Sequence, residues 1–149
     1  MKNRHQHGAQ AVEFALVLPF FLVLLLLITD LGFLVYNKAV ITNASREAAR
    51  WGTVLTVSPW TTANVATVAC NYVRSSLITT STGTHTSSCT GTADPVIAVS
   101  NPNGNVPPHF GDPVSVTITY PYQGLLKTFI GNRIESAWSL TAVTTMNHE

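Results

Sequence analysis

The strongest constraint on this chain is an apolar run near its N-terminus, which is long enough to cross a membrane. From Phe14 to Tyr36, only Thr29, Asp30 and Gly32 interrupt it. An α-helix rises about 1.5 Å per residue, so these 23 residues would extend about 34 Å, against about 30 Å of bilayer hydrocarbon. The run therefore predicts one transmembrane helix.

A carboxylate, Glu13, stands directly before this run. An ionised carboxylate near the bilayer costs several kcal/mol unless it is paired or shielded, which marks it as functional by default. Upstream lies a leader containing Lys2 and Arg4, followed by Gly8. A basic leader, a Gly and a Glu five positions after that Gly together predict a prepilin-type processing site, cut between Gly8 and Ala9.

Such a cut would place a new amino terminus close to the Glu13 carboxylate. Ala9 and Glu13 are four residues apart on one helix face, about 6 Å from each other. The ammonium and the carboxylate can neutralise each other, or the carboxylate can reach the terminal amine of a neighbouring subunit. We therefore assign Gly8 and Ala9 to processing, and Glu13 and Phe14 to assembly. Without Gly8 and the apolar run, Glu13 would only complement a helix dipole.

The position of the cut also predicts the topology. A secretory signal is removed by a cut after its apolar core, whereas this cut precedes the core and leaves the helix in the mature protein. Basic residues flank both ends of the run, so their count does not settle the orientation. The short leader predicts a cytoplasmic N-terminus. We expect a leader at 1–8, a transmembrane helix at 9–36 and a periplasmic domain at 37–149.

Two cysteines, Cys70 and Cys89, lie beyond the membrane segment. In a small exported domain, an even pair favours one disulfide, because the periplasm is oxidising and the core is small. Closing this loop would contribute about 3 kcal/mol on the chain-entropy model. Two buried free thiols are the alternative.

Two residues inside the apolar run have open interpretations. Pro19 removes a backbone donor and should bend or loosen the helix, either as a tolerated kink or for assembly. Asp30 either lies at the outer interface, solvated by water or headgroups, or contacts a neighbouring helix.

Beyond the membrane, the pattern predicts an α+β domain with a small antiparallel sheet packed on the long helix. Apolar residues at helical spacing extend this helix from about Val12 to Gly52 or Val57, with an end before Pro59. A second helix is expected over Thr61–Leu77, capped by Thr61 or Thr62, with one face formed by Val65, Val68, Ala69, Tyr72 and Val73. The remaining expected elements are a loop at 79–94, strands at 95–100, 114–120 and 134–146, a turn at 101–104 and a helical turn at 125–130.

Composition and spacing argue against catalysis, metal binding and nucleic-acid binding. Charged residues make up 10% of the chain, and no block of like charges exists to hold a phosphate backbone. The five histidines are scattered, no metal-ligand or nucleophile motif occurs, and no cofactor is expected. We interpret Trp51, Trp60 and Trp138 as packing or interface residues, in preference to a ligand-stacking set.

The chain resembles the TadE-like family, minor pilins or pseudopilins of the tight-adherence (Flp) pilus system. Three stretches carry the resemblance: 8–19 (GAQAVEFALVLP), then 30–32 with 39–50 (DLG and AVITNASREAAR), and 116–122 with 140–149. The resemblance implies cleavage by a prepilin peptidase after Gly8 and partnership with other pilin subunits and the pilus machinery of a bacterial inner membrane. Family members often carry Arg after the Asp-x-Gly, where this chain has Phe33.

We therefore predict a minor pilin or pseudopilin that acts through assembly and is not an enzyme. It would be a single-pass inner-membrane protein, surrounded by lipid, that can also enter the extracellular pilus. The alternative is a signal-anchored periplasmic binding module that never enters a filament. A membrane-tethered enzyme is a third class that no residue in the chain supports.

Overall fold

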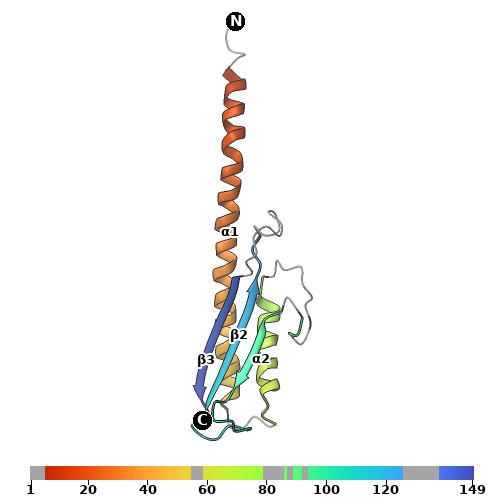
Figure 1. Cartoon of the computed structure of the whole chain (residues 1–149), viewed down its shortest axis with the longest axis vertical. Coiled ribbons are helices and arrows are strands. Elements are labelled where there is room, and N and C mark those ends of the chain that lie inside the picture. The colour runs from red at the N-terminus through yellow and green to blue at the C-terminus, as the bar shows by residue number, and fades with distance from the viewer. Residues whose placement is uncertain (1–5, 55–58, 79–85, 87–88, 92–93, 126–137) are drawn as a thin grey trace.

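The protein consists of a long N-terminal helix and a small α+β domain (Figure 1). We call this domain the head; it comprises the C-terminal half of the long helix, a second helix and a sheet. The computed structural model describes residues 6–54, 59–78, 86, 89–91, 94–125 and 138–149, with side chains from residue 10 onwards. The elements, in chain order, are α1 (Gln6–Gly52), α2 (Thr62–Ser76), β1 (Val96–Ser100), β2 (Pro113–Tyr122) and β3 (Trp138–Asn147). The predicted α+β class, with a long apolar N-terminal helix and a small antiparallel sheet, is confirmed.

Helix α1 is continuous through Pro19 and ends at Gly52, the earlier of the two expected ends. The Trp60 indole donates a hydrogen bond of 2.8 Å to the Gly52 carbonyl, which satisfies one of the free acceptors at the helix end. A Cβ at position 52 would lie 3.2 Å from Val65 and 3.3 Å from Val114. The helix thus ends at the earlier expected position, since Thr53 and Val54 are not helical, and Val57 lies outside the described residues.

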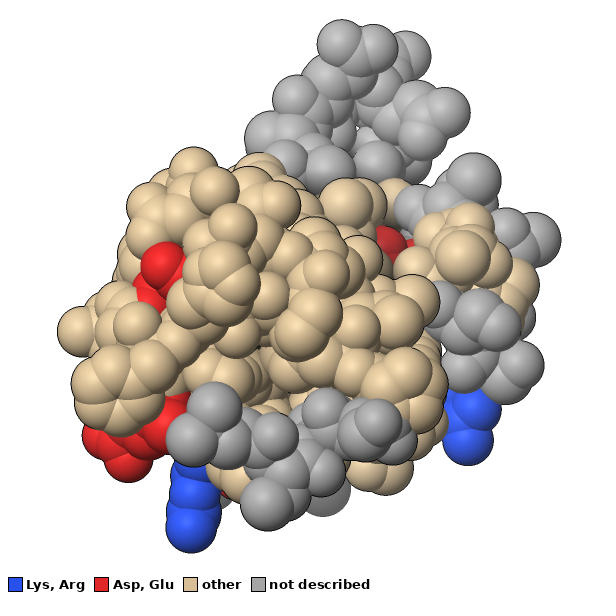
Figure 2. Space-filling view, turned by 90° about the horizontal axis from the view of Figure 1, so that it is seen from below, with Lys and Arg blue, Asp and Glu red and all other residues tan. Residues whose placement is uncertain are grey.

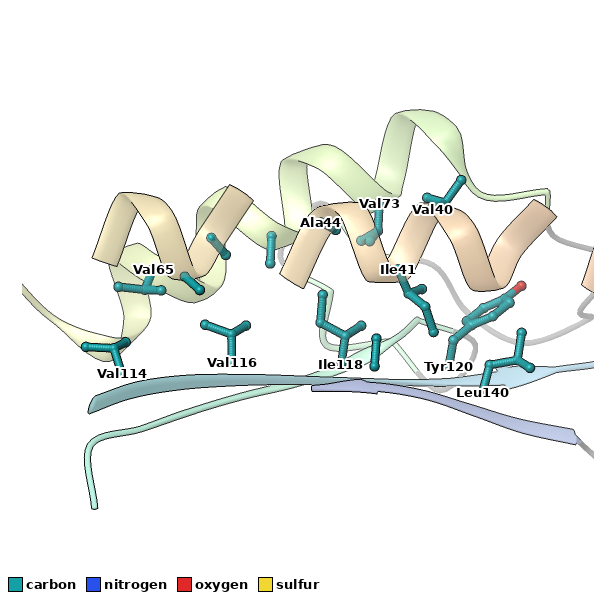
Figure 3. Close-up of a cluster of buried hydrophobic side chains, with 14 of the residues drawn as sticks. Val40, Ile41, Ala44, Val65, Val73, Val114, Val116, Ile118, Tyr120 and Leu140 are labelled. Atoms are coloured by element: carbon teal, nitrogen blue, oxygen red, sulfur yellow. The ribbon is translucent and has the colours of Figure 1, made fainter. Parts of the chain in front are cut away.

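The three strands form one antiparallel sheet in the order β1-β2-β3. The alternation expected for 114–120 is confirmed, since every second side chain of β2 is buried and faces the helices (Figure 3). The buried row continues to the end of the strand and comprises Val114, Val116, Ile118, Tyr120 and Tyr122. This row packs against the small and apolar residues of α1, which are Val40, Ile41, Ala44, Ala48 and Ala49.

Helix α2 begins as predicted, because the Thr61 hydroxyl accepts a hydrogen bond of 3.1 Å from the Asn64 amide. Its buried face differs from the prediction: Tyr72 is exposed, Val68 is only partly buried, and Cys70 is buried although it was not predicted. Just past the helix end, buried Asn37 of α1 exchanges two hydrogen bonds with the Ile78 backbone, at 2.9 and 3.0 Å. This exchange fastens α2 to α1.

The remaining expected elements are only partly described. β1 falls within the expected strand, and the turn at 101–104 is present, with the Gly104 amide 2.9 Å from the Asn101 carbonyl and a Gly104 φ of +76°. β3 covers most of the expected final strand. The helical turn at 125–130, the first residues of the 134–146 strand and most of the loop at 79–94 lie outside the described residues.

Candidate membrane anchor and assembly site

The first half of α1, before Asp30, extends away from the head (Figure 1). It does not pack against any other described element. It is the one described helix that is long and apolar enough to cross a membrane, and none of its most apolar window is buried. Large apolar side chains are exposed along it, including Phe14 at 67% and Phe20 at 74%. An apolar surface of this size on all sides of a helix needs lipid or other helices to cover it.

The predicted assembly residues Glu13 and Phe14 are exposed on this half of the helix. Among the described residues, no side chain forms a hydrogen bond or ion pair with the Glu13 carboxylate. The predicted processing residues Gly8 and Ala9 lie within the first turns of α1. The structure therefore leaves this carboxylate available to a partner.

The junction between the two halves of α1 is held by Asp30. Its carboxylate accepts hydrogen bonds from the Tyr122 hydroxyl at 2.5 Å and from the Leu125 amide at 3.1 Å, and the same hydroxyl lies 3.2 Å from the Asp30 carbonyl. A Cβ added at Gly124 would collide with this carboxylate, so a glycine is needed here. Burial and the neighbouring Asp30 raise the pKa of Tyr122 above its ordinary value, which keeps the phenol protonated as a donor.

This contact adds a partner that neither sequence interpretation of Asp30 included. The carboxylate is bonded to its own chain, at the end of β2. The sequence shows an acidic residue inside an apolar helix, and such residues are almost always paired with another polar group. The partner itself lies 92 residues away in the chain, too far for local patterns to indicate.

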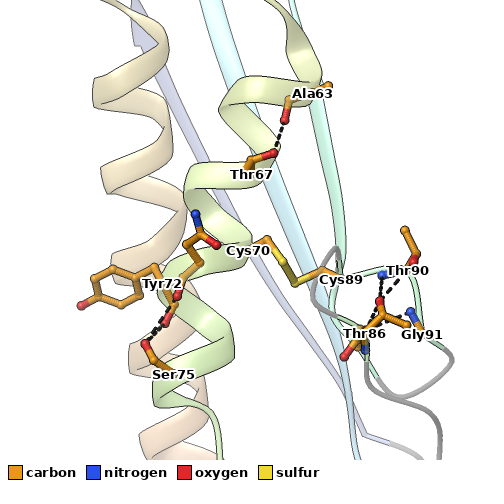
Figure 4. The surroundings of a disulfide bond; sticks show 11 residues. Ala63, Thr67, Cys70, Tyr72, Ser75, Thr86, Cys89, Thr90 and Gly91 are labelled. Carbon is orange, nitrogen blue, oxygen red and sulfur yellow. Dashed lines mark hydrogen bonds between the residues drawn. A yellow bond between two sulfur atoms is a disulfide. The ribbon is translucent and has the colours of Figure 1, made fainter.

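The expected disulfide between Cys70 and Cys89 is present, with Cα atoms 5.8 Å apart (Figure 4). It joins α2 to a short segment that Asp94 organises: the Asp94 carboxylate accepts hydrogen bonds from the Thr86 amide and the Gly91 amide, both at 2.8 Å. Figure 4 shows Thr86 and Gly91 on the Cys89 side of the bridge. The disulfide and Asp94 thus hold the described residues of this segment against the head.

A second buried carboxylate, Asp112, organises the loop between β1 and β2 at the end of the head far from the apolar helix. It accepts hydrogen bonds from the Asn103 and Asn105 side chains, at 2.6 and 2.7 Å, and from the His109 amide at 2.8 Å. These bonds, that of Asn105 most of all, hold the pKa of Asp112 well below its usual range. No local pattern in the sequence predicts this role of Asp112.

The end of the head that carries this loop is largely uncharged (Figure 2). Phe110 is 82% exposed there and Val106 65%. The three tryptophans do not gather: Trp60 is buried, Trp51 packs on the edge of the core and Trp138 is 61% exposed. A ligand-stacking set of tryptophans is therefore not formed.

Within the part of the chain that the structure describes, no group of three or more His, Cys, Asp or Glu residues is placed to hold a metal ion. Asp30, Asp94 and Asp112 each hold segments of the chain together. What the arrangement offers chemically is an exposed apolar helix with one carboxylate, fixed to a cross-linked head.

Comparison with known proteins gives one finding. Residues 8–50 match the protein family described as TadE-like protein, which confirms the resemblance over this segment. The matched range starts at the predicted cut and runs to the last turn of α1. No curated protein and no solved structure matches the chain. The match covers less than a third of the chain and includes neither α2 nor the sheet.

Proposed function

We propose that this protein is a minor pilin or pseudopilin of a tight-adherence pilus system, because residues 8–50 match the TadE-like family. It is held in the bacterial inner membrane by α1, with its N-terminus in the cytoplasm and its head in the periplasm. Its role is assembly with other subunits and the pilus machinery, and it performs no catalysis. The alternative remains a signal-anchored binding module that never enters a filament.

The observation that carries this proposal is the division of one unbroken helix into two environments. The half before Asp30 is apolar and exposed, while the half after it supplies the core of the head. The exposed half suits lipid while the subunit waits in the membrane, and it suits neighbouring helices once subunits assemble. A helix that only anchored a binding module would need the lipid-facing property alone.

Processing by a prepilin peptidase fits the position of Gly8 and Ala9. The bond between them lies within the first turns of α1, where helix ends have unpaired backbone groups and open most readily. Cleavage there removes Lys2 and Arg4 and leaves six basic and seven acidic side chains, from the eight and seven of the full chain. The new terminal ammonium is then the nearest cation to Glu13.

A periplasmic head is supported by the disulfide. Cys70 and Cys89 are both in the head and bonded to each other. Structural disulfides form and persist in oxidising compartments. The bridge therefore supports a head on the outer side of the inner membrane, with the short leader on the inner side.

The experiment that tests the assembly role compares two acidic residues of α1. Glu13 is on the exposed apolar half, and Glu47 is an exposed residue of the head half. In Glu13→Ala we expect normal membrane abundance but loss of co-purification with other pilus subunits, because the contact with a terminal ammonium is lost. Glu47→Ala is the matched control and should assemble normally. Normal assembly of Glu13→Ala at normal abundance would contradict the proposed role.

A further inference from the structure

Resting on the proposed membrane anchoring, we propose that the end of the head next to the apolar helix lies on the lipid headgroups. In this arrangement Asp30 marks the membrane boundary, and Trp138 is an interfacial anchor. We call this surface the membrane-facing end and define it as Tyr122 to Leu125 together with Trp138. The partner is a phospholipid surface.

A contact with Asp30 fixes the end of β2 to α1. Tyr122 and Leu125 both donate hydrogen bonds to the Asp30 carboxylate. The backbone between them is not in a strand or helix, and irregular backbone is not tolerated facing hydrocarbon. The hydrocarbon must therefore end at or before Asp30, about 1.7 turns of helix earlier than the Tyr36 expected from hydropathy alone.

The part of α1 before Asp30 is long enough to cross the hydrocarbon. Residues 10–29 rise about 30 Å at 1.5 Å each, which equals the thickness of the hydrocarbon core. Past Asp30 the helix already belongs to the head, since Phe33 and Leu34 pack against the core. Leu31, Val35 and Tyr36 on the outer side are exposed. Moving the boundary to Asp30 therefore removes no length that the membrane needs.

Trp138 lies at the same end of the sheet as the Asp30 contact. Trp138 is paired with Tyr122 in the β2–β3 register, so it lies beside the residue that contacts Asp30. Its side chain is 61% exposed and does not contribute to the core. Tryptophan is enriched where membrane meets water, because its ring is apolar and its indole N–H is a donor. A headgroup layer offers this side chain both environments.

The boundary is tested with three single-cysteine variants of the full chain, reconstituted in vesicles of phosphatidylcholine and phosphatidylglycerol. Ile28 and Val35 are 60% and 59% exposed, and seven residues separate them on one helix face. The native cysteines are bonded to each other and do not react. Asn43→Cys, on the exposed surface of the head half, sets the full labelling level for a membrane-impermeant maleimide.

We expect Val35→Cys to label as fully as Asn43→Cys, and Ile28→Cys to label only after detergent is added. Protection of Val35→Cys to the level of Ile28→Cys would overturn the boundary at Asp30 while leaving the anchoring intact. Equal labelling of all three without detergent would instead overturn the anchoring itself. The two failures are thus distinguishable.

Headgroup contact is tested separately by fluorescence quenching in vesicles whose lipids carry bromine near the headgroup. Trp51 lies about 30 Å along α1 from Asp30, and Trp60 is buried near Gly52, so neither should be quenched. We expect quenching of about one third of the emission, because Trp138 is one of three tryptophans. This quenching should disappear in Trp138→Phe. Equal quenching of the wild type and Trp138→Phe would overturn the contact.

Discussion

The two halves of α1 differ in residue size and in the pattern of polar side chains, although they form one continuous helix. Between Glu13 and Asp30 most side chains are large and apolar, and they are exposed on every face of the helix. After it, a stripe containing Ala44, Ala48 and Ala49 faces the sheet, and the charged residues Arg46 and Glu47 face outwards. The helix has an apolar surface on all faces where lipid is expected, and on one face only where it packs against the sheet.

Small residues in the second half explain why α1 lies so close to the sheet. Fully buried Ala44, Ala48 and Ala49 leave room for the row of larger side chains on β2, such as Ile118 and Tyr120. Leu or Phe at these helix positions, as in the first half, would overpack the core. Residue size, more than helix propensity, therefore divides the anchor from the head.

The largest expected effect comes from truncating a buried residue of the head half. Ile41 is fully buried, and Ile41→Ala should lower the free energy of unfolding of the head by about 2 to 5 kcal/mol. Ile28→Ala is the matched control, because Ile28 is 60% exposed and should change it by less than about 0.5 kcal/mol. Urea unfolding in detergent micelles, followed by near-ultraviolet circular dichroism, measures both. Equal losses would erase the distinction between the halves.

Removing the disulfide should weaken the head and leave the anchor unchanged. Cys70→Ser with Cys89→Ser is expected to lower the free energy of unfolding by about 3 kcal/mol, with no change in membrane abundance. Alkylation first checks that the bridge forms: neither thiol of the native protein should label before reduction, and both should label after it. Labelling of both without reductant would show that the bridge is absent.

Two tyrosines of β2 provide a finer test of the junction. Both are buried, but Tyr122 donates to Asp30, whereas the Tyr120 hydroxyl has no partner among the described residues. Tyr122→Phe should cost about 2 kcal/mol, because a hydrogen bond to a carboxylate is lost. Tyr120→Phe should be neutral or stabilising, because it removes an unpaired buried hydroxyl. A larger loss in Tyr120→Phe than in Tyr122→Phe would contradict this assignment.

The smallest expected effect is confined to the loop that Asp112 holds. Hydrogen bonds lower the folded-state pKa of Asp112, so the carboxylate stabilises the fold above its unfolded pKa of about 4. This contribution falls as the pH drops below about 4 and is lost once the pH passes the lower folded-state pKa. Amide shifts of Asn103 and His109 should report the change, and Asp112→Asn should remove the pH dependence. Unchanged titration in Asp112→Asn would show that another group is responsible.

Periodicity made most of the fold predictable. Alternation at 114–120 predicted the central strand, helical spacing predicted both helices, and Thr61 was one of two residues expected as the cap of α2. What remained hidden depends on contacts between distant segments. The Asp30–Tyr122 bond, the Trp60 bond to Gly52 and the Asp112 cluster each need the tertiary fold before their partners meet.

The candidate site was predictable to the same extent. The apolar run and its Glu13 are local features, and so are the residues of the predicted cut. The exposure of Trp138 is not local, because alternation in a strand does not say which end of the sheet meets the membrane. Hydropathy likewise placed the membrane boundary by composition, and the contact at Asp30 supplies the geometric reason for an earlier one.

The most direct test of the proposed anchored subunit is the intact mass of the protein extracted from membranes with an active prepilin peptidase. We predict the mass of a chain beginning at Ala9, which retains the whole apolar half of α1 and has lost Lys2 and Arg4. In Gly8→Leu, which blocks the predicted cut, the leader should remain. A native protein that still carries Lys2 and Arg4, or that has lost the apolar half, would contradict the assignment of α1 as a processed anchor.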